Sequence, residues 1–390
     1  MLRFSKYATM FPIEKFRQQN TPFYFYDLGL LRKTLETVKA CAAVNPAFKV
    51  HYAMKANANP VVIDEIRTAG LGIDAVSGGE IQRAMECGFD AGSIVFAGVG
   101  KNDREIELSL EAGIECFNVE SLPELEVINE KAMNMGKVAT VALRVNPNID
   151  AHTHHYITTG LSENKFGISR EQIIPIARMA VEMAGIDFVG LHFHIGSQLT
   201  EFRPYEMLCD TVNELQDEFE AAGIQLRSIN VGGGLGIDYN EPDKDPIPDF
   251  ASYFDTFNRG LKLRPCQTVH FELGRSIVGQ CGSLITRVLY IKKGLEKQFA
   301  IVDAGFTDLI RPALYQAYHK IENITAPVGE PEERYDVVGP ICESSDTFDK
   351  DVLLPLTKRG DLLAIRSAGA YGEIMASCYN CRPLPSSIAE

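Results

Sequence analysis

The first 275 residues alternate between short apolar runs and longer segments with helical periodicity. The apolar runs are rich in Val, Ile and Phe, which is typical of parallel strands buried on both faces. They predict eight strands, at Phe48–Met54, Gly72–Val76, Ile94–Ala97, Cys116–Val119, Val138–Val145, Phe188–His194, Ser228–Val231 and Thr268–Glu272. Helices are predicted before and between them, at 28–44, 60–70, 78–88, 102–112, 121–135, 170–184 and 203–222. This α/β alternation predicts a closed parallel (β/α)8 barrel rather than an open sheet.

Beyond the predicted barrel the pattern changes to short β-rich segments separated by Gly and Pro, at 276–292, 298–303, 335–339, 352–354 and 361–366. Few helical patterns interrupt them, so this part is predicted to be a second, mostly antiparallel β domain. The aromatic run 22–27 has no barrel unit of its own and is expected to pair with that domain. The predicted domains are therefore a barrel at 28–275 and a β domain made of 1–27 and 276–390.

The chain of 390 residues carries a formal charge of −14. Nucleic acids and anionic membranes both favour a basic surface, so neither is an expected partner. No apolar run approaches the ~20 residues that cross a bilayer, and the start of the sequence lacks the apolar core of a signal peptide. We therefore expect a cytoplasmic protein whose nine cysteines are mostly reduced thiols.

Residues at metal-ligand spacing are sparse in the sequence. Cys378 and Cys381 form a CxxC pair, but no second cysteine or histidine pair stands at zinc-site spacing. His152, His154 and His155 form a cluster without an acidic or thiol partner in the pattern. We therefore predict no metal site, which also disfavours a metal-dependent barrel hydrolase.

The segment KVHYAMKAN at 49–57 is predicted to be a mostly apolar strand that ends on Lys55. A lysine in this position is either a surface cation whose stem lies along apolar residues or a reactive amine in a pocket. Barrels carry their active sites at the carboxyl ends of the strands. Other candidate residues also fall at predicted strand ends, namely Asp74, Arg144, His194, Ser197, Gly233, Gly234, Glu272, Gly274 and Arg275.

A run of three glycines at 232–234 follows the seventh predicted strand. It is either a flexible turn or a loop whose backbone N–H groups converge on an anion. Barrels commonly bind phosphate after strands seven and eight, which favours the anion site. The run is not a GxGxxG motif after an opening strand, so no Rossmann dinucleotide site is expected.

An amine, a phosphate-binding loop and a carboxylate on the next strand together suggest pyridoxal phosphate as cofactor. Lys55 can supply the amine for a Schiff base, because burial lowers the pKa of a lysine. Glu272 can keep the pyridine nitrogen protonated, so that the ring accepts electrons. His194 can lie flat against the ring, although a hydrogen-bonded core histidine is the ordinary alternative.

Three motifs resemble the cofactor segments of the fold-type III pyridoxal phosphate-dependent decarboxylases. They are YAMKAN at 52–57, HFHIGS at 192–197 and VGGG at 231–234. The resemblance implies that Lys55 forms the Schiff base, that His194 stacks on the ring, and that Ser197 and the glycine loop contact the phosphate. It also implies cofactor contacts from Asp74, Gly233, Gly234, Glu272, Gly274, Arg275 and Tyr371.

Three later segments resemble the diaminopimelate branch of this family rather than its ornithine or arginine branch. They are RPALY at 311–315, GPICESSD at 339–346 and AYG at 370–372. A substrate with a second amino-acid end needs a cation for its distal carboxylate and an anion for its distal ammonium. Accordingly, substrate contacts are expected from Arg275, Arg311, Tyr315, Glu343, Ser344 and Tyr371.

The resemblance implies a lyase that decarboxylates meso-diaminopimelate to L-lysine and CO2, the last step of lysine biosynthesis. It further implies that Cys342 enters the site of the neighbouring subunit and protonates the substrate carbon, which requires a homodimer. Taken alone, Arg311 could instead make a surface salt bridge and Cys342 could be a small buried residue. The sequence departs from the family at Leu273, where proline is usual; the change should loosen the loop but leaves Glu272 and Arg275 in place.

Two further functions stay open at this level. A sister decarboxylase that acts on another basic amino acid or on carboxynorspermidine would share the cofactor residues. A non-enzymatic homologue that keeps the fold and binds partners is disfavoured by the joint presence of Lys55, Glu272 and Cys342.

Overall fold

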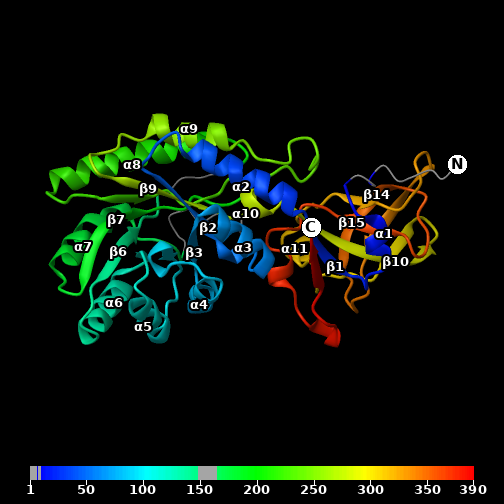
Figure 1. Ribbon diagram of the computed structural model, residues 1–390, viewed down its shortest axis with the longest axis horizontal. Helices are drawn as coiled ribbons and strands as arrows, with labels where there is room; N and C mark the ends of the chain where they lie inside the picture. The colour runs from blue at the N-terminus through cyan, green and yellow to red at the C-terminus, as the bar shows by residue number, and fades with distance from the viewer. Residues whose placement is uncertain (1–6, 8–9, 148–164) are drawn as a thin grey trace. The chain divides into compact units, whose positions relative to one another are not determined.

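The computed structural model describes Tyr7 and residues 10–147 and 165–390 (Figure 1). The histidine cluster His152, His154 and His155 lies outside the described residues. The chain divides into two compact units. The barrel unit comprises Arg32–Gly236 and Pro248–Ile277, and the β unit comprises Met1–Leu31, Ile237–Ile247 and Val278–Glu390.

The barrel unit is built on eight parallel strands that pair in chain order and close into a barrel, which confirms the predicted fold class. Strand β2 pairs with β9 and closes the ring. The strands are β2 (Phe48–Ala53), β3 (Gly72–Ala75), β4 (Ile94–Phe96), β5 (Cys116–Val119), β6 (Ala139–Arg144), β7 (Ile186–His192), β8 (Ser228–Asn230) and β9 (Thr268–Leu273). Most of their side chains are buried, as their apolar sequences require.

Helices connect these strands and lie around the barrel in Figure 1. They are α2 (Leu28–Ala42), α3 (Pro60–Ala69), α4 (Gly78–Glu86), α5 (Asp103–Ala112), α6 (Leu122–Asn134), α7 (Arg170–Glu182), α8 (Arg203–Ala221) and α9 (Phe250–Gly260). The bounds of α5 follow from its sequence, because Asn102 and Glu105 form a capping box and Gly113 ends the helix in the left-handed conformation. No helix in the described part of the chain has the length and apolar character that crossing a bilayer requires.

The β unit is built on an eight-stranded sheet in which β1 and β16 adjoin the path β12-β15-β10-β11-β13-β14. Most neighbours are antiparallel, as predicted; β11 and β13 pair in parallel, and so do β1 and β16. The strands are β1 (Phe23–Tyr26), β10 (Gly282–Lys293), β11 (Gln298–Val302), β12 (Ile321–Asn323), β13 (Glu332–Val338), β14 (Thr347–Pro355), β15 (Leu362–Ile365) and β16 (Ser386–Ala389).

One predicted extended segment is wrong at its start. The segment predicted at 276–292 begins inside the short helix α10 (Arg275–Val278), and β10 starts only at Gly282. The N–H of Ile277 donates to the carbonyl of Gly274 in this turn. A run as short as Ile277 and Val278 has no periodicity that separates a helical turn from a strand.

The aromatic strand β1 joins the two ends of the chain to the sheet. It pairs antiparallel with β10 and parallel with β16. Phe23 and Phe25 pack on Phe16 of helix α1 (Ile13–Arg17), with ring centroids 5.2 and 5.0 Å apart, in a cluster that includes Ile285 and Leu362. Edge-to-face contacts of this kind add to the free energy of burying the rings.

Candidate active site

Lys55 lies at the carboxyl end of the barrel, on the short 3₁₀-helix η1 (Met54–Ala56) that follows β2. Its Nζ is 3.1 Å from Oδ2 of Asp74, which lies on the neighbouring strand β3. The Lys55 side chain is 38% exposed, whereas that of Asp74 is fully buried. The amine is therefore held at the barrel rim against a buried carboxylate, which favours the reactive amine over a simple surface cation.

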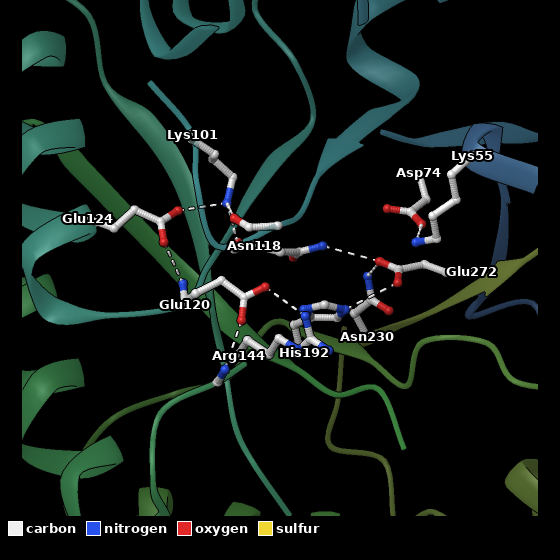
Figure 2. Close-up of polar contacts among 12 residues, drawn as sticks. Lys55, Asp74, Lys101, Asn118, Glu120, Glu124, Arg144, His192, Asn230 and Glu272 are labelled. Atoms are coloured by element: carbon white, nitrogen blue, oxygen red, sulfur yellow. Dashed lines mark hydrogen bonds and ion pairs between the residues drawn. The ribbon is translucent and has the colours of Figure 1, made fainter. Parts of the chain in front are cut away.

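Glu272 lies inside the same end of the barrel, among side chains from three other strands (Figure 2). Its Oε1 accepts hydrogen bonds from Nδ2 of Asn118 at 3.2 Å and of Asn230 at 2.7 Å, and its Oε2 is 3.2 Å from Nε2 of His192. Burial alone would raise the pKa of Glu272, but His192, then Lys55 and His194, outweigh it and hold the pKa below its usual range. Glu272 is thus a fixed, ionised carboxylate.

Asp74 differs from Glu272 although both are buried carboxyl groups at one barrel end. Burial, and then the charge of Glu272, raise the pKa of Asp74 to about 7, while Lys55 opposes the shift. Two neighbouring carboxyl groups in a weakly solvated site avoid ionising together. The site therefore holds one permanent negative charge, on Glu272, and a second group that gains or loses a proton near neutral pH.

His194 follows β7 and is neutral. Burial first, and then the positive charges of Arg144 and Lys55, lower the pKa of His194 to about 3. The backbone N–H of Gly233 lies 3.4 Å from Nδ1 of His194. A neutral imidazole held in this way can stack on an aromatic ring without bringing a positive charge to it.

The glycine run 232–234 is packed too closely to be a merely flexible turn. A Cβ on Gly233 would lie 1.8 Å from the carbonyl oxygen of Glu272, and one on Gly232 would lie 2.3 Å from that of Phe193. Gly232 and Gly234 also have positive φ angles of 70° and 110°, which favour glycine. The loop is thus a fixed run of backbone held against the barrel ends.

Ser197 and Arg275 lie together at the same barrel end. Nη2 of Arg275 donates to Oγ of Ser197 at 3.2 Å, and Arg275 is buried at the start of α10. Gly274 precedes it, and a Cβ there would be 3.1 Å from that of Ala56. A guanidinium, a hydroxyl and a glycine loop are donors suited to a phosphate group. With the ionised Glu272 and the neutral His194, these residues fit pyridoxal phosphate.

A second row of buried charges was not predicted from the sequence, except for Arg144, which stands among the predicted strand-end residues. Lys101, after β4, is 1% exposed and donates to Oε1 of Glu124 at 2.6 Å and to the carbonyl of Asn118 at 2.8 Å. Nη1 of Arg144 donates to Oε1 of Glu120 at 2.6 Å, and the N–H of Glu120 donates to Oε2 of Glu124 (Figure 2). The row ties the ends of β4, β5 and β6 together and holds the strand that carries Asn118.

Polar residues within apolar strands were the available signal for these groups. Asn118, His192 and Asn230 each stand at or near the carboxyl end of an otherwise apolar run. Side chains alternate along a strand, so a polar residue near such an end either enters the barrel or faces a covering helix. Which of the two occurs depends on strand register, which the sequence alone did not give.

In the β unit, Arg311 is buried at the start of α11 (Arg311–Tyr315), so its interpretation as a surface salt bridge is wrong. Its Nε is 3.2 Å from Nε2 of His319, and its Nη2 is 3.4 Å from the hydroxyl of Tyr239. Its guanidinium lies 5.7, 5.9 and 6.0 Å from the ring centroids of Tyr239, Tyr315 and Tyr371. Three aromatic rings therefore surround the cation.

Cys342, Glu343 and Ser344 lie on a separate, exposed loop of the β unit, between β13 and β14. The backbone N–H of Cys342 donates to Oδ1 of Asn380, and Glu343 accepts a 2.8 Å hydrogen bond from the hydroxyl of Tyr379. Cys342 is thus not a small buried residue. Its thiol is presented to solvent on the single chain.

The chain is similar to known proteins over almost its whole length. The family model for the pyridoxal-binding domain of pyridoxal-dependent decarboxylases matches residues 30–279. The diaminopimelate decarboxylase of Bacteroides thetaiotaomicron is 62% identical over 376 residues, which are 96% of this chain and 97% of that protein. That of Neisseria meningitidis serogroup A is 44% identical over 93% of this chain and 87% of that protein.

The fold has a solved counterpart as well. The crystal structure of diaminopimelate decarboxylase from Helicobacter pylori complexed with L-lysine superposes with a TM-score of 0.91 at 42% identity. The match covers 97% of this chain and 94% of that chain.

Proposed function

The chain belongs to the pyridoxal-dependent decarboxylases, and from this premise we propose that it converts meso-diaminopimelate to L-lysine and CO2. The proposal is carried by one observation, the ionised Glu272 fixed by Asn118, Asn230 and His192 at the barrel end that bears Lys55. The cofactor of the family is pyridoxal phosphate. When bound, it supplies an electron-withdrawing ring that accepts the electron pair left by the departing carboxylate.

We propose roles for the barrel residues that follow from their charge and partners. Lys55 would hold the cofactor covalently through its amine. Glu272 keeps a proton on the ring nitrogen, since its own pKa is held low. The neutral His194 would contact the cofactor ring. The phosphate is held by Ser197, Gly233, Gly234, Gly274 and Arg275, with further cofactor contacts from Asp74 and Tyr371.

The β unit is proposed to recognise the second amino-acid end of the substrate. Arg311 and Tyr315, with Arg275, bind the distal carboxylate, and Tyr371 contributes a hydroxyl. Glu343, with Ser344, binds the distal ammonium. A diamine precursor such as ornithine has no distal carboxylate and would forgo the charge-assisted hydrogen bonds with Arg311, which favours diaminopimelate. Carboxynorspermidine is disfavoured as an alternative substrate because the similar proteins named above are diaminopimelate decarboxylases.

We propose that the protein works as a homodimer in the cytoplasm. Cys342 of one protomer donates a proton to the substrate carbon in the site of the other. The exposure of Cys342, Glu343 and Ser344 on the single chain supports this arrangement. All nine cysteines are free thiols, in keeping with a reducing compartment.

Absorbance spectroscopy and CO2 release test the proposal together. The wild-type protein should show the visible band of lysine-bound cofactor, which changes on addition of meso-diaminopimelate, and should release CO2 from this substrate and not from carboxynorspermidine. Lys55→Ala should lose both the band and the activity, whereas Lys33→Ala, a change of an exposed lysine, should keep both. CO2 release from carboxynorspermidine and not from meso-diaminopimelate would identify carboxynorspermidine as the substrate instead. A visible cofactor band that persists in Lys55→Ala would overturn the assignment of Lys55.

A further inference from the structure

A second polar cluster lies at the amino ends of the barrel strands, away from η1 and Lys55. It borders a cleft of about 500 Å³ whose lining includes Lys49, His51, Gly72, Ser93 and Glu115. His51 lies on β2, Glu115 precedes β5, and His270 lies on β9 beside β2. The cleft therefore gives solvent a route to side chains that project from the seam where the barrel closes.

Three ligand-type atoms converge in this cluster. Nε2 of His51 is 2.9 Å from Nδ1 of His270 and 3.8 Å from Oε2 of Glu115, and the three groups lie within 4.8 Å of one another. Both histidines are buried, at 2% and 5% exposure, whereas the Glu115 side chain is 19% exposed. The carboxylate of Glu115 is thus the solvent-facing group of the cluster, at its rim, and the two imidazoles lie deeper.

The outer nitrogens of both imidazoles have neighbours that can accept a hydrogen bond, although Nδ1 of His51 makes none in the described part of the chain. Nε2 of His270 is 3.0 Å from the hydroxyl of Thr268. The backbone carbonyl of Ser93 is the group that interacts with His51, and a Cβ on Gly72 would lie 2.4 Å from Nδ1 of His51 and 2.6 Å from that carbonyl oxygen. A metal-bound histidine commonly donates its outer N–H to such an acceptor, which turns the inner lone pair toward the metal.

When both outer nitrogens carry the proton, the two inner lone pairs point at each other. At 2.9 Å these lone pairs repel unless a proton or a cation lies between them. A metal ion would satisfy both nitrogens at once, whereas a shared proton gives a single N–H···N hydrogen bond.

We propose that His51, His270 and Glu115 bind a divalent transition-metal ion of the Zn²⁺ class, with a fourth position open to the cleft. Two histidines and one carboxylate are a common three-ligand set for zinc. Nitrogens bound to tetrahedral zinc at about 2.0–2.1 Å are about 3.3 Å apart, so the imidazoles need to separate by only a few tenths of an ångström. Oε1 of Glu115 keeps its 3.0 Å contact with Lys49 while Oε2 faces the metal position.

The bound ion would cross-link β2, β9 and the start of β5, and so stabilise the closing seam of the barrel. No metal site was predicted from the sequence because the three residues are far apart along the chain, and ligand-spacing rules detect only neighbouring ligands. Binding to the folded state alone raises the thermal midpoint with increasing metal concentration.

The test uses holoenzyme carrying Cys378→Ser and Cys381→Ser, which removes the two exposed thiols of the CxxC pair as competing ligands. The protein is treated with a chelator, dialysed against Zn²⁺ and assayed for bound zinc and for its thermal midpoint. We expect one zinc per chain and a higher midpoint with zinc. Glu115→Gln in the same background should bind at least about tenfold more weakly, and His270→Gln should lose the zinc and the zinc-dependent shift.

Glu107→Gln serves as the matched control, because Glu107 is an exposed carboxylate paired with Lys131. It should bind zinc as the background protein does. Glu115 is a rim residue and Gln has the same shape, so Glu115→Gln reports on binding even if His270→Gln folds poorly. Absence of bound zinc in the background protein, or equal zinc in Glu115→Gln and Glu107→Gln, would overturn the site.

Discussion

Glu272 in the barrel and Arg311 in the β unit are buried charges with different kinds of partners, although the β unit also has a buried ion pair between Arg366 and Glu322. In the barrel, Glu272 receives hydrogen bonds from side chains of three other strands, and Lys101 contacts the carboxylate of Glu124. In the β unit, the guanidinium of Arg311 lies among aromatic rings. Hydrogen bonds and ion pairs fix both the place and the protonation of a charge. Ring faces add to the stabilisation of this cation, whose Nε and Nη2 also face His319 and the hydroxyl of Tyr239.

This difference suits two different tasks. A permanently bound cofactor needs a counter-charge that does not move, which a strand-borne carboxylate in a hydrogen-bond network provides. A substrate that enters and leaves needs a cation whose donors can engage a carboxylate on arrival. We therefore expect changes in the barrel network to alter turnover and stability, and changes at Arg311 to alter substrate binding.

The largest effect is expected for Glu272→Gln. The amide cannot keep a proton on the cofactor nitrogen, so kcat for CO2 release should fall about 10³-fold, within the range of acid–base contributions. The visible cofactor band should persist, because Lys55 is intact. Glu107→Gln, at an exposed position, is the control. A kcat near the wild-type value in Glu272→Gln would show that the charge at this position is not used.

Lys101→Met should lower stability rather than turnover. It leaves Glu124 buried without its cation, which typically costs about 3–5 kcal/mol and should lower the thermal midpoint by about 5–10 °C. Burial already raises the pKa of Glu124 against the opposing charge of Lys101, so the remaining carboxyl group should take up a proton. The double variant Lys101→Met with Glu124→Leu should recover most of the loss. An unchanged midpoint in the single variant would mean that the pair is not buried in solution.

Arg311→Met should chiefly raise KM, whereas Glu272→Gln should chiefly lower kcat. Losing the cation for the distal carboxylate should lower kcat/KM for meso-diaminopimelate about 10²-fold, while the cofactor band stays. Arg334→Met, at an exposed ion pair of the same unit, should leave both parameters unchanged. A fall in kcat at constant KM would contradict the division of tasks between the two units.

The sequence predicted the barrel and its strand-end residues because both depend on local pattern. Lys55, Glu272 and the glycine run stand at the ends of apolar runs, and parallel strands bring their ends together. Lys101 and His192 were not assigned roles, because their partners come from other strands and strand register decides which residues meet.

The β unit was harder to predict in detail. Strands β12 and β16 have three and four residues, too few to show an alternation. The aromatic surroundings of Arg311 come from Tyr239, Tyr315 and Tyr371, which belong to three distant segments. One of them, Tyr239, stands in the segment Ile237–Ile247, which groups with the β unit although it follows a barrel strand. The contact between Tyr239 and Arg311 could therefore not be predicted from the residues that adjoin either of them in the sequence.

The smallest predicted effect is a pH-dependent contribution of Asp74 to the free energy of unfolding. Glu272 should make no such contribution. In the cofactor-free protein the folded-state pKa of Asp74 is raised to about 7 from an ordinary value of 3.8. The folded state therefore binds this proton more tightly, and the resulting stability is complete below pH 3.8 and is lost as pH rises through 7. Asp74→Asn removes this dependence, so its thermal midpoint relative to wild type should be higher at pH 8 than at pH 5. The expected difference is on the order of 1–2 kcal/mol and is measured by thermal unfolding of both cofactor-free proteins. Parallel pH profiles of the two proteins would show that Asp74 is ionised in the folded barrel throughout this range.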